Sequence, residues 1–243
     1  MSALLEVAGL TKRFGGVTAV DNCSFSVEKG TITALIGPNG SGKTTAFNMI
    51  TGYLKADAGT MRFNGHDVAK PNPAKLYRSG LSRTFQQARI FPELSVRENL
   101  VVASGFSWGD LFGMRVSKSD RAAANEMLEE FRLDALADLR AADLSYGQRK
   151  LLEFAAVLMS SPKLVLLDEP TAGVNPVMID TMERHVRARH AEGVTFLIVE
   201  HDMQLVMRLC DPVIVLDNGA PIATGKPADV QSNPLVLDAY LGA

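Results

Sequence analysis

The sequence predicts an α/β fold with an inserted helical region, and three observations support this. Short runs of apolar and β-branched residues, such as residues 31–36 and 163–167, are typical of buried parallel strands. A glycine-rich loop of the form G-x-x-x-x-G-K-[ST] follows the first run, at residues 37–44, and leads into a stretch that can form a helix. Between about residues 88 and 162 helical periodicity replaces these strands, and the α/β pattern then returns.

Length and composition describe an ordinary globular protein. The 243 residues are 47% hydrophobic and 21% charged, and the formal net charge is −2, so the basic footprint typical of nucleic-acid partners is missing. The two cysteines, Cys23 and Cys210, have no metal-ligand spacing and are expected as free thiols in the core. We find no secretory signal at the N-terminus, and the apolar runs are far too short to cross a bilayer.

The first 87 residues predict strands around one helix. We expect strands at residues 4–8, 18–27 and 31–36, a helix that ends at Gly52, a strand at 59–63 closed by the hairpin dipeptide Asn64-Gly65, a helix at 73–79 and a strand at 81–85. The loop at residues 12–16 carries Phe14. Its ring suits stacking on a purine base, with a packed loop aromatic as the alternative.

Helical patterns fill residues 88–162. Ser95 and Glu98 form a capping box that begins a helix ending at about residue 104. Amphipathic helices are expected at residues 119–131 and 146–160. Residues 105–116 form a glycine-interrupted apolar loop, expected either in the core or at a contact surface.

The chain beyond residue 162 returns to alternating strands and helices. Asn175 and Pro176 are typical of the N-cap and first position of a helix, which we expect to end at about residue 191. The remaining expected elements are a strand at 194–199, a short helix to Cys210, a hairpin of 213–216 and 221–223, and helices at 226–231 and 233–241.

The glycine-rich loop is a candidate phosphate site. Glycines allow backbone N–H groups to turn toward an anion, and the helix N-terminus adds a partial positive charge. Lys43 would bridge the β- and γ-phosphates of a nucleotide, and Thr44 would be a ligand of Mg²⁺. A glycine-rich turn with a solvated lysine is the plain alternative, which the strand before the loop and the helix after it disfavour. The candidate nucleotide-binding residues of the loop are Asn39, Gly40, Ser41, Gly42, Lys43, Thr44 and Thr45.

Polar side chains follow three of the predicted strands. Asp168 is placed to hold Mg²⁺, and Glu169 is placed to orient and deprotonate a water. His201 is a candidate γ-phosphate contact, with a structural histidine as the alternative. Gln86 could reach either Mg²⁺ or the attacking water. Because ligands bind at the carboxyl ends of strands in open α/β sheets, these residues are expected at one site.

Residues 144–148 predict a second phosphate contact. Ser145 is expected as a helix N-cap, and a serine and a glycine at a helix N-terminus also suit an anion. Since the first loop serves the nucleotide of this chain, Ser145, Gly147 and Gln148 would contact a nucleotide that another subunit holds.

Over its whole length the chain resembles the ATP-binding-cassette (ABC) ATPases. The motifs are the Walker A loop at 37–44, Gln86 of the Q-loop, the signature at 144–148, the Walker B strand at 163–168 with Glu169, the D-loop at 172–175 and the switch histidine His201. The resemblance implies a P-loop NTPase (RecA-like) core and an antiparallel β-subdomain, formed by residues 1–87 and 163–243, with a helical subdomain at 88–162. It also implies adenine stacking on Phe14 and a head-to-tail dimer around two ATP molecules.

Two departures from the family pattern indicate a subgroup. Tyr146 stands where the usual signature has glycine, and Asn175 stands where the D-loop usually has aspartate. Both variations, together with residues 233–242, resemble the ATPases of branched-chain amino acid uptake. The expected protein is therefore a peripheral ATPase on the cytoplasmic side of the plasma membrane. Its expected partners are permease subunits and a second ABC ATPase, identical or related. A lipopolysaccharide-type exporter ATPase and a soluble, non-transport ABC ATPase remain the alternatives.

Overall fold

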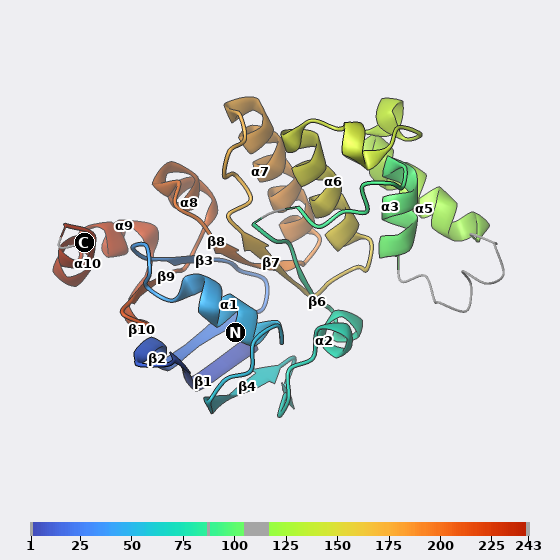
Figure 1. The fold of residues 1–243 in the computed structure, drawn as a ribbon. Coiled ribbons are helices and arrows are strands. Elements are labelled where there is room, and N and C mark those ends of the chain that lie inside the picture. The colour runs from blue at the N-terminus through green and yellow to red at the C-terminus, as the bar shows by residue number, and fades with distance from the viewer. Residues whose placement is uncertain (1, 87, 105–116, 242–243) are drawn as a thin grey trace.

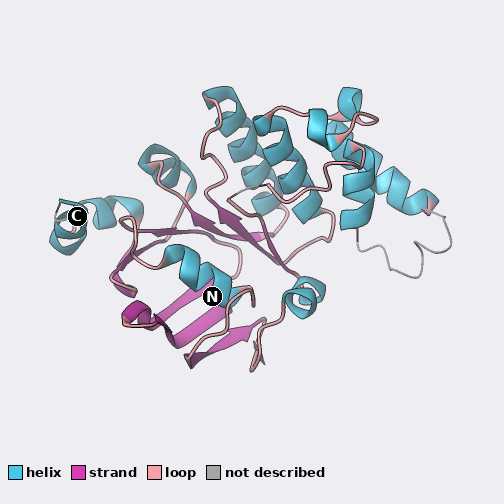
Figure 2. Cartoon of the chain, in the orientation of Figure 1, coloured by secondary structure: helices cyan, strands magenta, loops and turns pink. Residues whose placement is uncertain are grey.

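Two β-sheets and a set of helices form the computed structural model, which describes residues 2–86, 88–104 and 117–241 (Figures 1 and 2). The larger sheet has six strands in the order β10 (Ala220–Gly225), β9 (Val213–Asp217), β3 (Ile32–Ile36), β8 (Thr195–Val199), β7 (Leu164–Asp168) and β6 (Leu81–Arg83). Neighbouring strands from β9 to β6 are parallel, and β10 is an antiparallel edge. The sheet therefore places the carboxyl ends of β3, β8, β7 and β6 along one edge.

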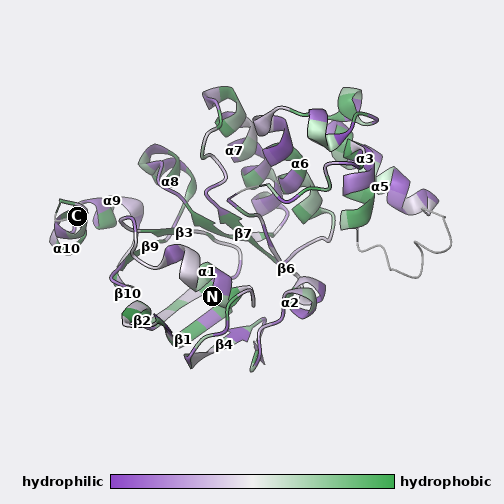
Figure 3. Cartoon of the chain, viewed as in Figure 1, coloured by the Kyte–Doolittle hydropathy of each residue, from purple (hydrophilic) through white to green (hydrophobic). Residues whose placement is uncertain are grey.

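Strands β3, β7, β8 and β9 are buried on both faces, which explains why they appear in the sequence as nearly unbroken hydrophobic runs (Figure 3). Alternate residues belong to two separate cores. Leu35, Leu166 and Leu197 pack with helix α1 (Lys43–Ile50) and the smaller sheet. Ile36 and Leu167, from the opposite face, pack with the helices that follow residue 95.

The smaller sheet is antiparallel and packs on the face that α1 also covers. Its strands are β2 (Val17–Glu28), β1 (Ala3–Phe14), β4 (Ala58–Phe63) and β5 (His66–Asp67). The prediction of a loop at residues 12–16 was wrong, because β1 continues to Phe14 and pairs it with Val17. Pairing with β2 on one side and β4 on the other, interrupted by register shifts, extends this strand beyond its apolar stretch.

The helices agree with the predicted ones to within a few residues. They are α2 (Pro73–Ser79), α3 (Val96–Ala103), α5 (Lys118–Glu130), α6 (Tyr146–Leu158), α7 (Pro176–Ala191), α8 (Met203–Leu209), α9 (Pro227–Gln231) and α10 (Pro234–Leu241), with short 3₁₀ turns at Asp134–Leu136 and Ala141–Asp143. The capping box of Ser95 and Glu98 is confirmed, as is the Asn175 cap. The apolar loop predicted at 105–116 lies outside the described residues. Cys23 and Cys210 are buried free thiols, as expected.

No described helix combines the length and hydrophobicity needed to cross a membrane.

Candidate functional site

The phosphate loop connects β3 to α1 and its shape depends on glycine. The φ angles of Gly37, Gly40 and Gly42 are 151°, 81° and 98°, in the region that L-residues with a side chain avoid. Space is also limiting, since a Cβ on Gly42 would lie 2.4 Å from the backbone oxygen of Ala19. The loop lines a cavity of about 180 Å³ that Glu169 and His201 also line. The structure thus brings the two strand-end residues to the predicted phosphate loop.

Lys43 lies folded over this loop. Its Nζ donates hydrogen bonds to the backbone oxygens of Gly37 and Pro38, at 2.9 and 2.8 Å, and lies 3.3 Å from Oγ of Ser41. Burial lowers the pKa of Lys43, while the nearby carboxylates of Glu169 and Asp168 raise it. A buried ammonium that holds only loop oxygens is well placed to exchange them for phosphate oxygens.

Glu169, Gln86 and His201 form one hydrogen-bonded group. Nε2 of Gln86 donates to Oε2 of Glu169 at 3.0 Å, and Nε2 of His201 lies 2.9 Å from Oε1 of the same carboxylate. Glu169 also has a φ of 47°, which a residue with a side chain adopts at an energetic cost. Strain of this kind is common at functional sites.

Asp168 is held by a residue that the sequence analysis did not identify. Arg83, at the end of β6, donates from Nη2 to Oδ2 of Asp168 at 2.6 Å, and both side chains are buried. The backbone N–H of Asp168 donates to Oγ1 of Thr84 at 3.2 Å. The last residue of β6 therefore contacts the carboxylate of Asp168, and the residue after β6 contacts its backbone.

The segment around Gln86 is held by two further residues that sequence reasoning missed, both on α6. Nζ of Lys150 donates to the backbone oxygens of Phe85 and Gln86, at 3.1 and 2.6 Å. Oε1 of Glu153 accepts from the backbone N–H groups of Phe85 and Arg89, at 3.1 and 3.0 Å. Lys150 is 2% exposed and Glu153 is 4% exposed. Helix α6 thus fixes the backbone on both sides of Gln86 with buried charged groups.

The signature residues form the N-terminus of the same helix. Ser145 caps α6 by accepting from the backbone N–H of Gln148 at 3.3 Å, and the Gln148 side chain accepts from the N–H of Ser145 at 2.9 Å. A Cβ on Gly147 would lie 3.3 Å from Val174 and Met178, and one on Gly173 would lie 3.3 Å from the Tyr146 ring. Signature and D-loop therefore pack closely within one chain. The signature residues do not line the phosphate-loop cavity.

Phe14 lies at the tip of the β1–β2 hairpin. Its side chain is half-exposed, and Nζ of Lys12 lies 5.5 Å from its ring centroid. The ring does not line the cavity. Adenine stacking on Phe14 stays a prediction.

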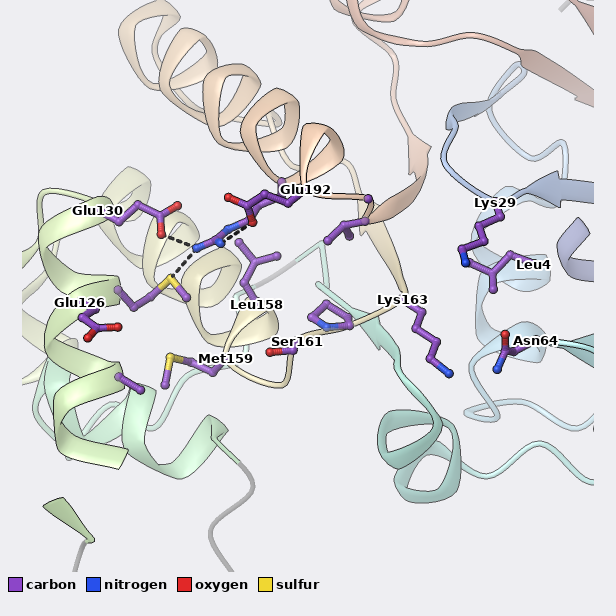
Figure 4. Close-up of a pocket in the computed structure, with 16 residues that line it drawn as sticks. Leu4, Lys29, Asn64, Glu126, Glu130, Leu158, Met159, Ser161, Lys163 and Glu192 are labelled. Carbon is purple, nitrogen blue, oxygen red and sulfur yellow. Dashed lines mark hydrogen bonds and ion pairs between the residues drawn. The ribbon is translucent and has the colours of Figure 1, made fainter. Parts of the chain in front are cut away.

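A larger cavity of about 760 Å³ lies between α5, the C-terminal end of α7 and the edge near Lys29 (Figure 4). Arg189 bridges Glu130 and Glu192 at one end of it, and burial raises the pKa of Glu130. The cavity contains none of the phosphate-loop or strand-end residues described above. We therefore assign the nucleotide to the smaller cavity.

The Mg²⁺ prediction is compatible with the groups present. Mg²⁺ sites commonly use one or two protein groups, with phosphates and waters completing the coordination. Thr44 and Asp168 supply a hydroxyl and a carboxylate of this kind. Among the described residues, no group of three or more His, Cys, Asp or Glu side chains forms a protein cage for a metal.

A phosphate loop between a central strand and a helix, with Asp-Glu at the end of a nearby parallel strand, defines a P-loop nucleotide-binding protein. The family model described as ABC transporter matches residues 20–172, and one described as branched-chain amino acid ATP-binding cassette transporter matches residues 220–243. The chain belongs to the ABC transporter ATP-binding family. The fold predicted from the resemblance is confirmed.

Named relatives define the subgroup further. The chain is 41% identical to the high-affinity branched-chain amino acid transport ATP-binding protein BraF of Pseudomonas aeruginosa, with 98% of each chain covered. It is 38% identical to the corresponding protein LivG of Escherichia coli K12, again over 98% of each chain. Among solved structures, a nucleotide-free ATP-binding cassette from an ABC transporter matches with a TM-score of 0.89, 38% identity and complete coverage of both chains. The predicted resemblance to branched-chain amino acid transport ATPases is confirmed.

Proposed function

We propose that this chain is the ATP-hydrolysing subunit of an importer for branched-chain or related amino acids. The observation that carries the proposal is the contact of Glu169 with Gln86 and His201 at the phosphate-loop cavity. The names of the relatives support the choice of cargo.

Glu169 is the proposed general base. Each of its two carboxylate oxygens has one polar partner, Gln86 or His201, and each keeps a second lone pair that could accept a proton from water. Lys43 and the backbone N–H groups of the loop would hold the phosphates of ATP. Thr44 and Asp168 would hold Mg²⁺, with Gln86 as a further contact; the bound metal would neutralise the charge of the phosphates.

The proposed working form is a dimer attached to membrane permeases. Ser145, Gly147 and Gln148 would complete the site of a second ABC ATPase, because they lie apart from the phosphate loop of their own chain. The helical subdomain at 88–162 and the core at 1–87 and 163–243 would move relative to each other. The chain would lie on the cytoplasmic face of the plasma membrane, without crossing it.

The test is hydrolysis of ATP by the purified chain and by Glu169→Gln, with and without Mg²⁺. Loss of a general base should lower the rate by about 10²- to 10⁴-fold while ATP binding persists and the dimer accumulates on gel filtration. A variant that hydrolyses ATP at the normal rate contradicts the role given to Glu169.

Mild purification of the tagged chain from its own cells tests the partners. Two polytopic membrane proteins and a related ATPase would support the importer. Export-type membrane proteins with a single ATPase species would favour a lipopolysaccharide-type exporter. Ribosomal or DNA-repair proteins without any membrane protein would contradict transport and leave the ATPase chemistry intact.

A further inference from the structure

Arg83 is a buried cation that binds the proposed metal ligand directly. Its Nη2 lies 2.6 Å from Oδ2 of Asp168, and the two side chains are 6% and 4% exposed. We propose that Arg83 is a positioning residue for the divalent metal. It occupies Oδ2 of Asp168, so that Oδ1 is the oxygen left for the metal or a metal-bound water. This inference rests on the proposed function and deepens it.

Arg83 also connects Asp168 to the helix that follows the phosphate loop. Its Nη1 donates to Oδ1 of Asn48 at 2.7 Å and to Oγ1 of Thr51 at 2.9 Å. Asn48 lies four residues after Thr44, one helical turn along α1. The planar guanidinium therefore holds the strand that carries one proposed ligand and the helix that carries the other at a fixed separation.

The surroundings of Arg83 exclude water from this contact. Its Cζ lies 4.9 Å from the ring centroid of Phe85 and 5.7 and 5.9 Å from those of Phe47 and Tyr53. The aromatic faces favour a planar cation, and a hydrogen bond between charged groups strengthens where water is absent. Without a cation at this place, the buried carboxylate of Asp168 would be left without its charge partner.

The test is a titration of Mn²⁺, a paramagnetic substitute for Mg²⁺, followed by electron paramagnetic resonance. The full chain carries Glu169→Gln, so that ATP remains intact. Adding Arg83→Lys keeps the positive charge but removes the guanidinium group that contacts Asp168 and α1 at the same time. This change should weaken Mn²⁺ binding in the presence of ATP by roughly 10- to 100-fold. Binding of ATP in the presence of EDTA should not change, since Arg83 does not contact the phosphate loop.

Two more variants separate positioning from general packing. Asn48→Ala removes one contact to α1 and leaves the Arg83–Asp168 pair, so it should weaken Mn²⁺ binding in the same direction by a smaller factor. Arg89→Lys is the matched control, because Arg89 also stacks on Phe85, at 3.8 Å from its centroid. It makes no hydrogen bond to Asp168, and its Mn²⁺ affinity should be unchanged.

The outcomes distinguish this inference from the proposed function. Unchanged Mn²⁺ binding by Arg83→Lys overturns the inference. Tighter binding also overturns it, because it would mean that the Arg83 guanidinium competes with the metal for Asp168. If that variant does not fold, unchanged Mn²⁺ binding by Asn48→Ala overturns it instead. Failure of the Glu169→Gln parent to bind Mn²⁺ with ATP would contradict the proposed nucleotide chemistry itself.

Discussion

The phosphate loop and the Gln86 segment, comprising Phe85, Gln86 and Arg89, bring polar groups to the same sheet edge but are held differently. Glycines with positive φ and the folded Lys43 hold the phosphate loop, all within a few residues. The Gln86 segment is held from α6, by buried side chains 64 to 68 residues further along the chain. A site residue held by its own loop stays with the core, whereas one held by a distant helix can follow that helix.

Lys150→Met tests this difference most strongly. The substitution removes both hydrogen bonds to the backbone of the Gln86 segment and takes away a buried cation whose charge favours the ionised form of Glu153. We expect a loss of about 3–5 kcal/mol in the free energy of unfolding, measured by urea denaturation. ATP hydrolysis should fall while ATP affinity, measured in EDTA, stays constant. A parallel loss of ATP affinity would show that the two regions are not held independently.

The double variant Lys150→Met with Glu153→Gln is the control for charge. It removes both buried charges, which interact electrostatically. The double variant should therefore lose less free energy of unfolding than the two single variants lose together. Strict additivity would mean that the two residues act separately on the Gln86 segment.

Gly42→Ala tests the locally held region. Its added Cβ would lie 2.4 Å from the backbone oxygen of Ala19, so the loop must shift. We expect ATP binding to weaken by about 3 kcal/mol or more, the contribution of two charge-assisted hydrogen bonds. Gly40→Ala is the matched control, because its φ is also positive but nothing lies within 4 Å of an added Cβ. Strain of about 1 kcal/mol is expected there. ATP affinity is measured by calorimetry. Equal losses of affinity in the two variants would contradict the argument that the contact with Ala19 determines the effect.

The sequence predicted the phosphate loop well, but it did not predict the contacts that hold the Gln86 segment. The glycines, Lys43 and the strand ends with Asp168, Glu169 and His201 follow contiguous patterns. Their placement at one edge of the sheet follows from the parallel strand order. The sequence analysis did not single out Arg83, Lys150 or Glu153, because their burial depends on contacts between distant segments. The close approach of the Tyr146 ring to Gly173 depends in the same way on contacts between distant segments. Strand β1 was predicted too short because its outer part is stabilised by pairing rather than by apolar residues.

Glu153 also predicts a pH dependence. Burial raises the pKa of Glu153, against hydrogen bonds from Arg89 and Phe85 that lower it. The folded state therefore binds this proton more tightly than the unfolded state. The resulting stabilisation is complete below the ordinary pKa of 4.5 and is lost as pH rises through the higher folded value. The melting temperature of the unaltered chain, measured relative to that of Glu153→Gln at the same pH, should fall as the pH rises from 4.5 toward neutrality. A difference that is constant with pH would contradict this.

The smallest expected change in stability compares two equivalent helix caps. Ser145 and Ser95 each form a capping box, at the start of α6 and α3. Replacing either by alanine should therefore lower the free energy of unfolding by about 1 kcal/mol. Only Ser145→Ala should also lower ATP hydrolysis, because Ser145 is the residue proposed to contact the partner's nucleotide. If both variants keep full ATPase activity in the assembled dimer, Ser145 only caps α6. The nucleotide of the partner subunit would then not act on Gln86 through Ser145 and α6.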